Sequence, residues 1–116
     1  MKPVYCAPVL IAALAACATQ KQPLYAWGNY EELIYSSYAA PGKVSPETQV
    51  EKLEQDYQKA RAANLRVPPG FHAQLGYLYY ELGKADQARQ EFETEKAEFP
   101  ESAVFMDRLL TRMRKQ

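Results

Sequence analysis

The chain has 116 residues, with 14 basic and 14 acidic side chains and a formal net charge of zero. This length is enough for one small domain with a modest core, and the balanced charge argues against nucleic acid as a main partner. One histidine and two cysteines, Cys6 and Cys17, are too few ligands for a typical zinc site, so no metal is expected.

Residues 1–16 have the features of an export signal. Lys2 supplies a positive charge, and residues 7–16 form an uncharged apolar run that ends in small side chains. The run is too short for a transmembrane helix, which needs about 20 apolar residues. We therefore expect residues 1–16 to be removed and to take no part in the fold.

A cysteine, Cys17, directly follows the tripeptide Leu-Ala-Ala at 14–16. This order resembles the lipobox of bacterial lipoproteins. The resemblance implies cleavage before Cys17 and a covalent diacylglycerol and acyl chain on that cysteine, with no other cofactor. Ala18 at the next position implies delivery to the periplasmic face of the outer membrane if the source is Gram-negative. An accidental cysteine after an ordinary signal, or a Cys6–Cys17 disulfide in a retained leader, is the alternative.

Residues 17–23 are predicted to be a short lipidated tether. The stretch is polar after Cys17, and six residues reach at most about 20 Å when extended. The folded domain, residues 24–116, is therefore expected close to the membrane that holds the anchor.

The first predicted helix begins after Gly28. Asn29 is a suitable N-cap, with Glu32 three positions later as its capping-box partner. Four apolar positions share one helical face: Tyr30, Leu33, Ile34 and Tyr38. The dipeptide at 41–42, Pro-Gly, ends this helix.

The second predicted helix begins at the N-cap Ser45, with Pro46 in its first turn. Its apolar stripe comprises Val50, Leu53, Tyr57 and Ala60. The helix ends near Asn64, before the Pro-Pro-Gly sequence at 68–70. Since no stretch alternates long enough to indicate a sheet, the predicted fold class is all-α.

Residues 69–102 resemble a tetratricopeptide repeat (TPR), a pair of antiparallel helices of about 34 residues. Small residues at Gly76 and Ala88 would let the two helices approach closely, and Gly83 would end the first helix in the left-handed conformation. The matching positions are Leu75, Gly76, Tyr79, Ala88, Phe92 and Pro100.

Two positions depart from the repeat pattern. His72 stands where tryptophan is common, and Glu95 stands where a small residue is usual. A charge at Glu95 is expected to weaken packing against the following helix.

A shift of 34 residues reveals no second copy, and about three repeats are needed for a stable stack. The flanking helices, 45–64 and 102–114, must therefore complete the core around one TPR-like unit. The last helix is predicted to act as a cap. Its expected apolar face is Val104, Phe105, Leu109 and Met113, with Asp107, Arg108 and Arg112 outside.

Three segments, 24–31, 68–76 and 99–106, together resemble a family of small bacterial lipoproteins of unknown function with a repeat-like fold. The resemblance covers nearly all of residues 17–116. It implies a genomic association with a lipoprotein similar to the curli secretion channel and with another small lipoprotein. A channel-like envelope lipoprotein is therefore the expected partner.

The case for an enzyme is weak. The lone His72 falls on the side of its helix that faces the partner helix, and no spacing offers it a catalytic partner. The acidic cluster Glu91, Glu93, Glu95 and Glu98 is expected to be a solvated face. We expect no catalytic residue and no small-molecule substrate.

Two surfaces are candidates for binding a partner. The repeat resemblance implies a concave surface formed by Ala73, Tyr77, Tyr80 and Glu81. The aromatic segment 24–38, with Trp27 and Tyr30, is the second. Alternatively, Tyr77 and Tyr80 pack against neighbouring helices, and the aromatic segment folds onto its own domain or lies in the lipid headgroup region.

The predicted function is that of a protein–protein adaptor or accessory subunit in an envelope complex. The alternative function is a structural or maturation factor for an outer-membrane secretion channel.

Overall fold

The computed structural model describes residues 2–3 and 21–116. Apart from Lys2 and Pro3, the predicted signal peptide lies outside the described residues, and so do Cys17 and the tether residues 18–20. The described elements are α1 (Tyr30–Ala39), α2 (Pro46–Ala62), α3 (Phe71–Glu81), α4 (Ala85–Glu98), a 3₁₀ turn η1 (Pro100–Ser102) and α5 (Ala103–Arg114). The all-α prediction is therefore confirmed.

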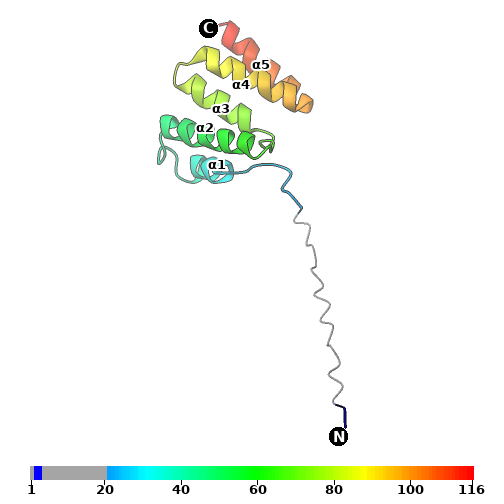
Figure 1. Ribbon diagram of the computed structural model, residues 1–116. Helices are drawn as coiled ribbons and strands as arrows, with labels where there is room; N and C mark the ends of the chain where they lie inside the picture. The colour runs from blue at the N-terminus through cyan, green and yellow to red at the C-terminus, as the bar shows by residue number, and fades with distance from the viewer. Residues whose placement is uncertain (1, 4–20) are drawn as a thin grey trace.

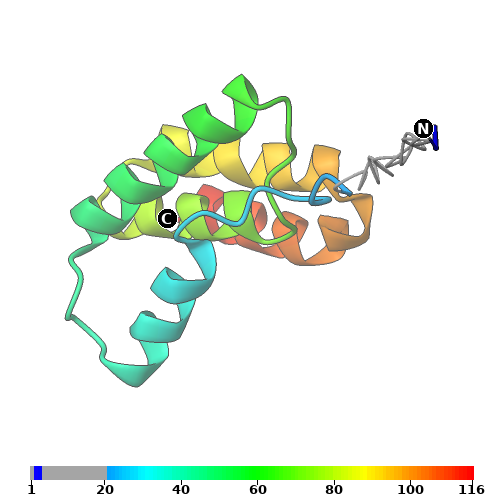
Figure 2. The same ribbon diagram turned by 60° about the horizontal axis from the view of Figure 1, so that its bottom comes forward.

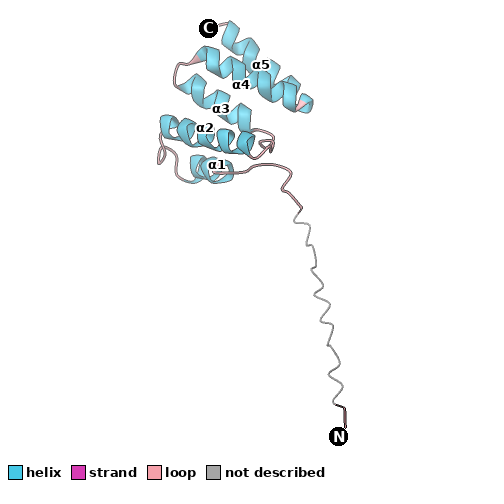
Figure 3. Cartoon of the chain, viewed as in Figure 1, coloured by secondary structure: helices cyan, strands magenta, loops and turns pink. Residues whose placement is uncertain are grey.

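The helices stack side by side in chain order, from α1 at one edge to α5 at the other (Figure 1). The chain runs back and forth, so the connections α1–α2 and α3–α4 lie at one end of the stack. The connections α2–α3 and α4–α5 lie at the opposite end, where the chain enters from the N-terminus (Figure 1). Figure 3 shows the short loops that join the helices, and Figure 2 shows α1 diverging from α2.

The helix ends follow the sequence signals closely, with one exception. The Ser45 hydroxyl accepts a hydrogen bond from the Thr48 amide at 3.2 Å, so the predicted N-cap of α2 is confirmed. The predicted capping box at α1 is wrong, because the Asn29 side chain makes no cap hydrogen bond there. Its amide Nδ2 instead donates to the buried carboxylate of Asp56 on α2, at 3.0 and 3.1 Å.

Helices α3 and α4 form a close antiparallel hairpin around Gly76. A methyl group added there would lie 2.7 Å from the Phe92 ring and 3.1 Å from the Ala88 carbonyl oxygen. Only glycine leaves room for this approach. Gly83 makes the turn between the helices with a φ of +73°, in the left-handed region that glycine adopts without strain.

Two hydrophobic clusters form the core. The first joins α1, α2 and α3 through Leu33, Leu53, Ala60, Val67, Phe71, Leu75 and Leu78. The second joins α4 and α5 through Ala88, Phe92, Met106 and Leu110. Tyr79 packs against both clusters, so α3 connects the two halves of the domain.

The apolar face predicted for the last helix is partly wrong. Met106 and Leu110 are its buried residues, whereas Val104 and Phe105 are 67% and 58% exposed. Leu109 and Met113 do pack against the core. The face towards α4 is therefore rotated by about one residue from the predicted one, since Met106, Leu110 and Met113 follow helical spacing.

Candidate functional site

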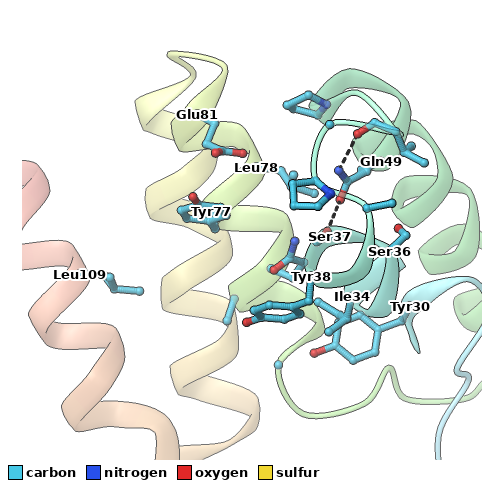
Figure 4. A pocket seen from close by; sticks show the side chains of 18 of the residues that line it. Tyr30, Ile34, Ser36, Ser37, Tyr38, Gln49, Tyr77, Leu78, Glu81 and Leu109 are labelled. Atoms are coloured by element: carbon cyan, nitrogen blue, oxygen red, sulfur yellow. Dashed lines mark hydrogen bonds between the residues drawn. The ribbon is translucent and has the colours of Figure 1, made fainter. Parts of the chain in front are cut away.

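A groove of about 910 Å³ runs along the inner faces of α1, α3 and α5. These three helices run in the same direction, with α2 and α4 between them in the stack (Figure 1). Figure 4 shows the groove with α1 on one side, α3 at its centre and α5 on the other side. A concave surface of this size, shared by three elements, is the main candidate for a binding site.

Helix α3 supplies the central wall of the groove. Ala73, Tyr77 and Glu81 lie at intervals of four residues and share one face of the helix. Tyr77 is 50% exposed. A hydrogen bond to the Glu81 carboxylate raises the pKa of Tyr77, with Coulombic repulsion from the same carboxylate as the second cause.

Helix α1 supplies one side wall, with Tyr30, Ile34 and Tyr38 at the same four-residue interval. Tyr38 is 83% exposed, so it is not part of the buried face that the sequence predicted. Tyr30 is partly buried next to Gly70, and burial raises its pKa, with the nearby carboxylate of Glu95 as a further cause.

Polar contacts hold α1 at both ends. At its start, the Asn29 backbone amide donates to Asp56 at 2.6 Å. Near its end, the Ser37 hydroxyl lies 3.4 Å from Gln49 Oε1, and the Gln49 amide donates to the Val44 carbonyl at 3.0 Å. These contacts position the wall although α1 buries only Leu33 fully.

Helix α5 supplies the other side wall, with Phe105, Leu109 and Arg112. Phe105 is exposed because the helix turns Met106 and Leu110 towards α4. Arg112 and Glu81 bring opposite charges to the groove near the C-terminal ends of their helices. The groove is thus mostly apolar and aromatic, with charged side chains at one end.

The predicted binding residues separate into three places. Ala73, Tyr77, Glu81 and Tyr30 line the groove. Tyr80 does not line it, and its hydroxyl donates to Gln116 at the end of the chain. Trp27 also lies outside the groove, beside Tyr25 and Tyr30 where the chain enters the domain.

Sequence reasoning missed the contributions of α5, of the α1–α2 connection, of Gln49 on α2 and of Gln74 on α3 to the groove. The signal was present for α5, because Phe105, Leu109 and Arg112 recur at helical spacing. Phe105 and Leu109 were instead predicted to face the core, since nothing in the sequence shows which of two adjacent apolar stripes faces α4.

The acidic residues of α4 are not all solvated, which corrects the sequence prediction. Glu95 is 2% exposed, and its Oε1 accepts a hydrogen bond from the Gly70 amide at 2.7 Å. Glu91 Oε2 lies 2.6 Å from Nδ1 of His72, which is 1% exposed. The Glu95 carboxylate therefore binds the start of α3 through Oε1.

Within residues 2–3 and 21–116, no group of three or more histidine, cysteine, aspartate or glutamate side chains is placed to hold an ion. None of the helices in this part of the chain combines the length and apolar character needed to cross a membrane.

Residues 24–109 match the family described as a domain of unknown function, DUF4810. The match spans most of the chain and all five α-helices except the last residues of α5. The chain therefore belongs to this family. Neither a curated protein nor a solved structure matches the chain.

Proposed function

We propose that this member of the DUF4810 family is an adaptor or accessory subunit of an envelope complex, anchored through Cys17 to the periplasmic face of the outer membrane. In this proposal it binds a segment of another envelope protein in the groove between α1, α3 and α5. The observation that carries the proposal is that one groove collects exposed aromatic side chains from all three helices.

The chemistry of the groove favours a protein ligand. Tyr38, Tyr77 and Phe105 are 83%, 50% and 58% exposed. Aromatic side chains with a large apolar surface are enriched where binding energy concentrates in protein interfaces. Glu81 and Arg112 at one end offer charged partners that would fix the orientation of a bound segment.

The TPR-like interpretation of the α3–α4 hairpin agrees with this role. In helical repeats of this kind, the first helix of each pair faces a concave binding surface. The groove residues of α3 take that position, while Gly76, Ala88 and Phe92 pack between the two helices.

A catalytic role fits less well. His72 is 1% exposed and is absent from the groove lining. Its close contact with Glu91 supports a structural role in joining α3 to α4. The proposal therefore includes no reaction, no small-molecule substrate and no cofactor beyond the lipid on Cys17.

The expected partner is a channel-like envelope lipoprotein. This part of the proposal rests on the family resemblance of segments 24–31, 68–76 and 99–106.

Site-specific photocrosslinking in the native cell envelope tests the proposal. A photoreactive phenylalanine analogue replaces Tyr77 in the groove, and a matched variant carries it at Tyr35. Tyr35 is 72% exposed on α1 but does not line the groove. We expect one discrete adduct from position 77, identified by mass spectrometry as a channel-like lipoprotein, and none from position 35.

A second variant checks that the adduct depends on the groove itself. Phe105→Ala, combined with the photoreactive group at position 77, should weaken the adduct at least several-fold while the protein level is unchanged. Equal adducts from positions 35 and 77, or none from either, would contradict binding in the groove.

A further inference from the structure

The chain enters the folded domain along a defined path. The Ala26 amide donates to the Arg66 carbonyl at 2.8 Å, and Tyr25 forms an isolated bridge with the same residue. The Tyr25 ring also meets the Phe99 ring edge-on, at 6.1 Å between centroids. The segment is therefore fixed to the end of the stack that holds the α2–α3 and α4–α5 connections (Figures 1 and 2).

Large apolar side chains are exposed at this same end. Leu24 is 74% exposed, and Trp27 is 43% exposed while it packs against Tyr25 and Tyr30. Val104, in the first turn of α5 directly after η1, is 67% exposed. We call Leu24, Trp27 and Val104 the entry surface.

The entry surface is not a patch of one charge that would attract a charged partner. Lys21 and Arg66 are basic, but Glu98 and Glu101 lie on the adjoining chain. Arg66 is already engaged, because its guanidinium lies 4.9 Å from the Phe99 ring and donates to the Glu98 carbonyl at 3.0 Å. The contacts available to a partner are therefore apolar and aromatic.

The covalent chain places this surface near the proposed anchor. Cys17 precedes Leu24, the first residue of the entry surface, by seven residues, which span at most about 25 Å even when fully extended. An acyl-anchored Cys17 thus keeps this end of the domain within reach of the lipid headgroups. Tryptophan and tyrosine are favoured in that region, because their rings join an apolar body to a polar tip.

From this placement we infer that the entry surface rests on the membrane, with Leu24, Trp27 and Val104 in the lipid headgroup region. The inference depends on the proposed lipid anchor at Cys17, but it does not depend on any partner in the groove. The inference also fixes the orientation of the domain relative to the membrane. Helices α1, α3 and α5 begin at the membrane and point away from it, so the charged end of the groove at Glu81 and Arg112 faces the periplasm.

Fluorescence quenching by brominated lipid tests the orientation, since Trp27 is the single tryptophan of the chain. The lipidated protein is reconstituted into phosphatidylcholine vesicles, with and without phosphatidylcholine brominated near the headgroup end of its acyl chains. We expect brominated lipid to lower Trp27 emission at least twofold. The matched control is the double variant Trp27→Phe, Asp86→Trp, whose probe is at the start of α4 on the opposite end.

The control probe should lose less than a tenth of its emission. Replacing Leu24 and Val104 by serine should at least halve the quenching of Trp27, while the protein still floats with the vesicles. Flotation with no quenching of Trp27, or with equal quenching at positions 27 and 86, would overturn the orientation alone. A natural chain that does not float with vesicles would overturn the anchor and the orientation together, whereas the groove is judged separately by its photocrosslinks.

Discussion

At the scale of single residues, buried polar side chains connect the helices through hydrogen bonds. Asp56 joins α2 to the start of α1, Glu95 joins α4 to the start of α3, and the His72–Glu91 contact joins α3 to α4. Each is buried or partly buried, and its hydrogen bonds offset part of the cost of removing the group from water. His72 Nε2 and Glu95 Oε2 are buried without a hydrogen-bond partner. These residues hold the walls of the groove in place without lining it.

Gly76→Ala should destabilise the protein, although alanine is the better helix former by about 1 kcal/mol. The added methyl group would meet the Phe92 ring at 2.7 and 2.8 Å and the Ala88 carbonyl oxygen at 3.1 Å. Because overpacking costs about 1–3 kcal/mol, urea denaturation should show a net loss of stability. The loss should shrink when Phe92→Leu is already present. A stabilised Gly76→Ala protein would show that the hairpin is looser than described.

The stability of the protein should fall as the pH rises above about 10, where an unperturbed tyrosine ionises, and Tyr79 should account for part of this loss. Burial, followed by the 2.6 Å hydrogen bond to Glu54, raises the pKa of Tyr79 above its ordinary value. Above that ordinary pKa the unfolded chain loses the proton while the folded chain keeps it, so unfolding becomes more favourable.

Urea midpoints measured between pH 7 and pH 11 check this prediction. Tyr79→Phe should show a smaller loss of stability across that range than the natural chain. Tyr35→Phe, which changes an exposed side chain, serves as the control. The same slope in all three proteins would rule out Tyr79 as the source.

At the scale of elements, α1 differs from the other helices. It fully buries one side chain, Leu33, and Tyr30 packs at the edge of the first cluster. Polar contacts add the Asn29–Asp56 pair at one end and the Ser37–Gln49 pair near the other. In contrast, α3 buries five residues. The α1 wall should therefore open more readily than the α3 wall, since local stability follows buried apolar contact.

Leu33→Ala tests the attachment of α1. Removing a buried leucine side chain costs about 2–5 kcal/mol, and hydrogen exchange should quicken in residues 30–39 much more than in α3 and α4. Tyr35→Ala, on the exposed side of the same helix, should leave exchange nearly unchanged. Uniform acceleration in all helices would mean that α1 opens only with the whole domain.

At the scale of the whole molecule, the two hydrophobic clusters are linked through α3. Tyr79 packs against both of them, while Phe71, Leu75 and Leu78 belong to the first. The groove spans both clusters, because its walls come from α1, α3 and α5. Its shape therefore depends on the domain folding as one unit.

Met106→Ala tests whether the domain unfolds as one unit. Met106 is 1% exposed in the second cluster, and its truncation should cost about 2–5 kcal/mol. Trp27 reports from the other half of the molecule. In both the natural chain and the variant, the unfolding curves from Trp27 fluorescence and from far-ultraviolet circular dichroism should coincide, as a two-state transition requires. A variant in which helix is lost before the Trp27 signal changes would show that the two halves unfold independently.

Much of the fold was predictable from local signals, and part of the groove from the repeat resemblance. The start of α2 at Ser45 and Pro46 and the turn at Gly83 each depend on residues near one another in the chain. The close approach of Gly76 to Ala88 and Phe92 was instead implied by the repeat resemblance. The repeat resemblance implied one concave surface on α3, and the structure places Ala73, Tyr77 and Glu81 of that surface in the groove. Tyr80 came from the same resemblance, and Trp27 belonged to the second candidate surface, but neither lines the groove.

By itself, the sequence determined the class of fold, the positions of the helix ends and the need for glycine at the Gly83 turn, because these depend on backbone conformation and near neighbours. Only the tertiary structure decided which stripe of α5 is buried, that Glu95 binds the Gly70 amide and that Asn29 pairs with Asp56. These outcomes depend on contacts between residues far apart in the chain, where one rotation of a helix exchanges its buried and exposed faces. The groove depends on these long-range contacts, since its three walls meet only after the helices have stacked.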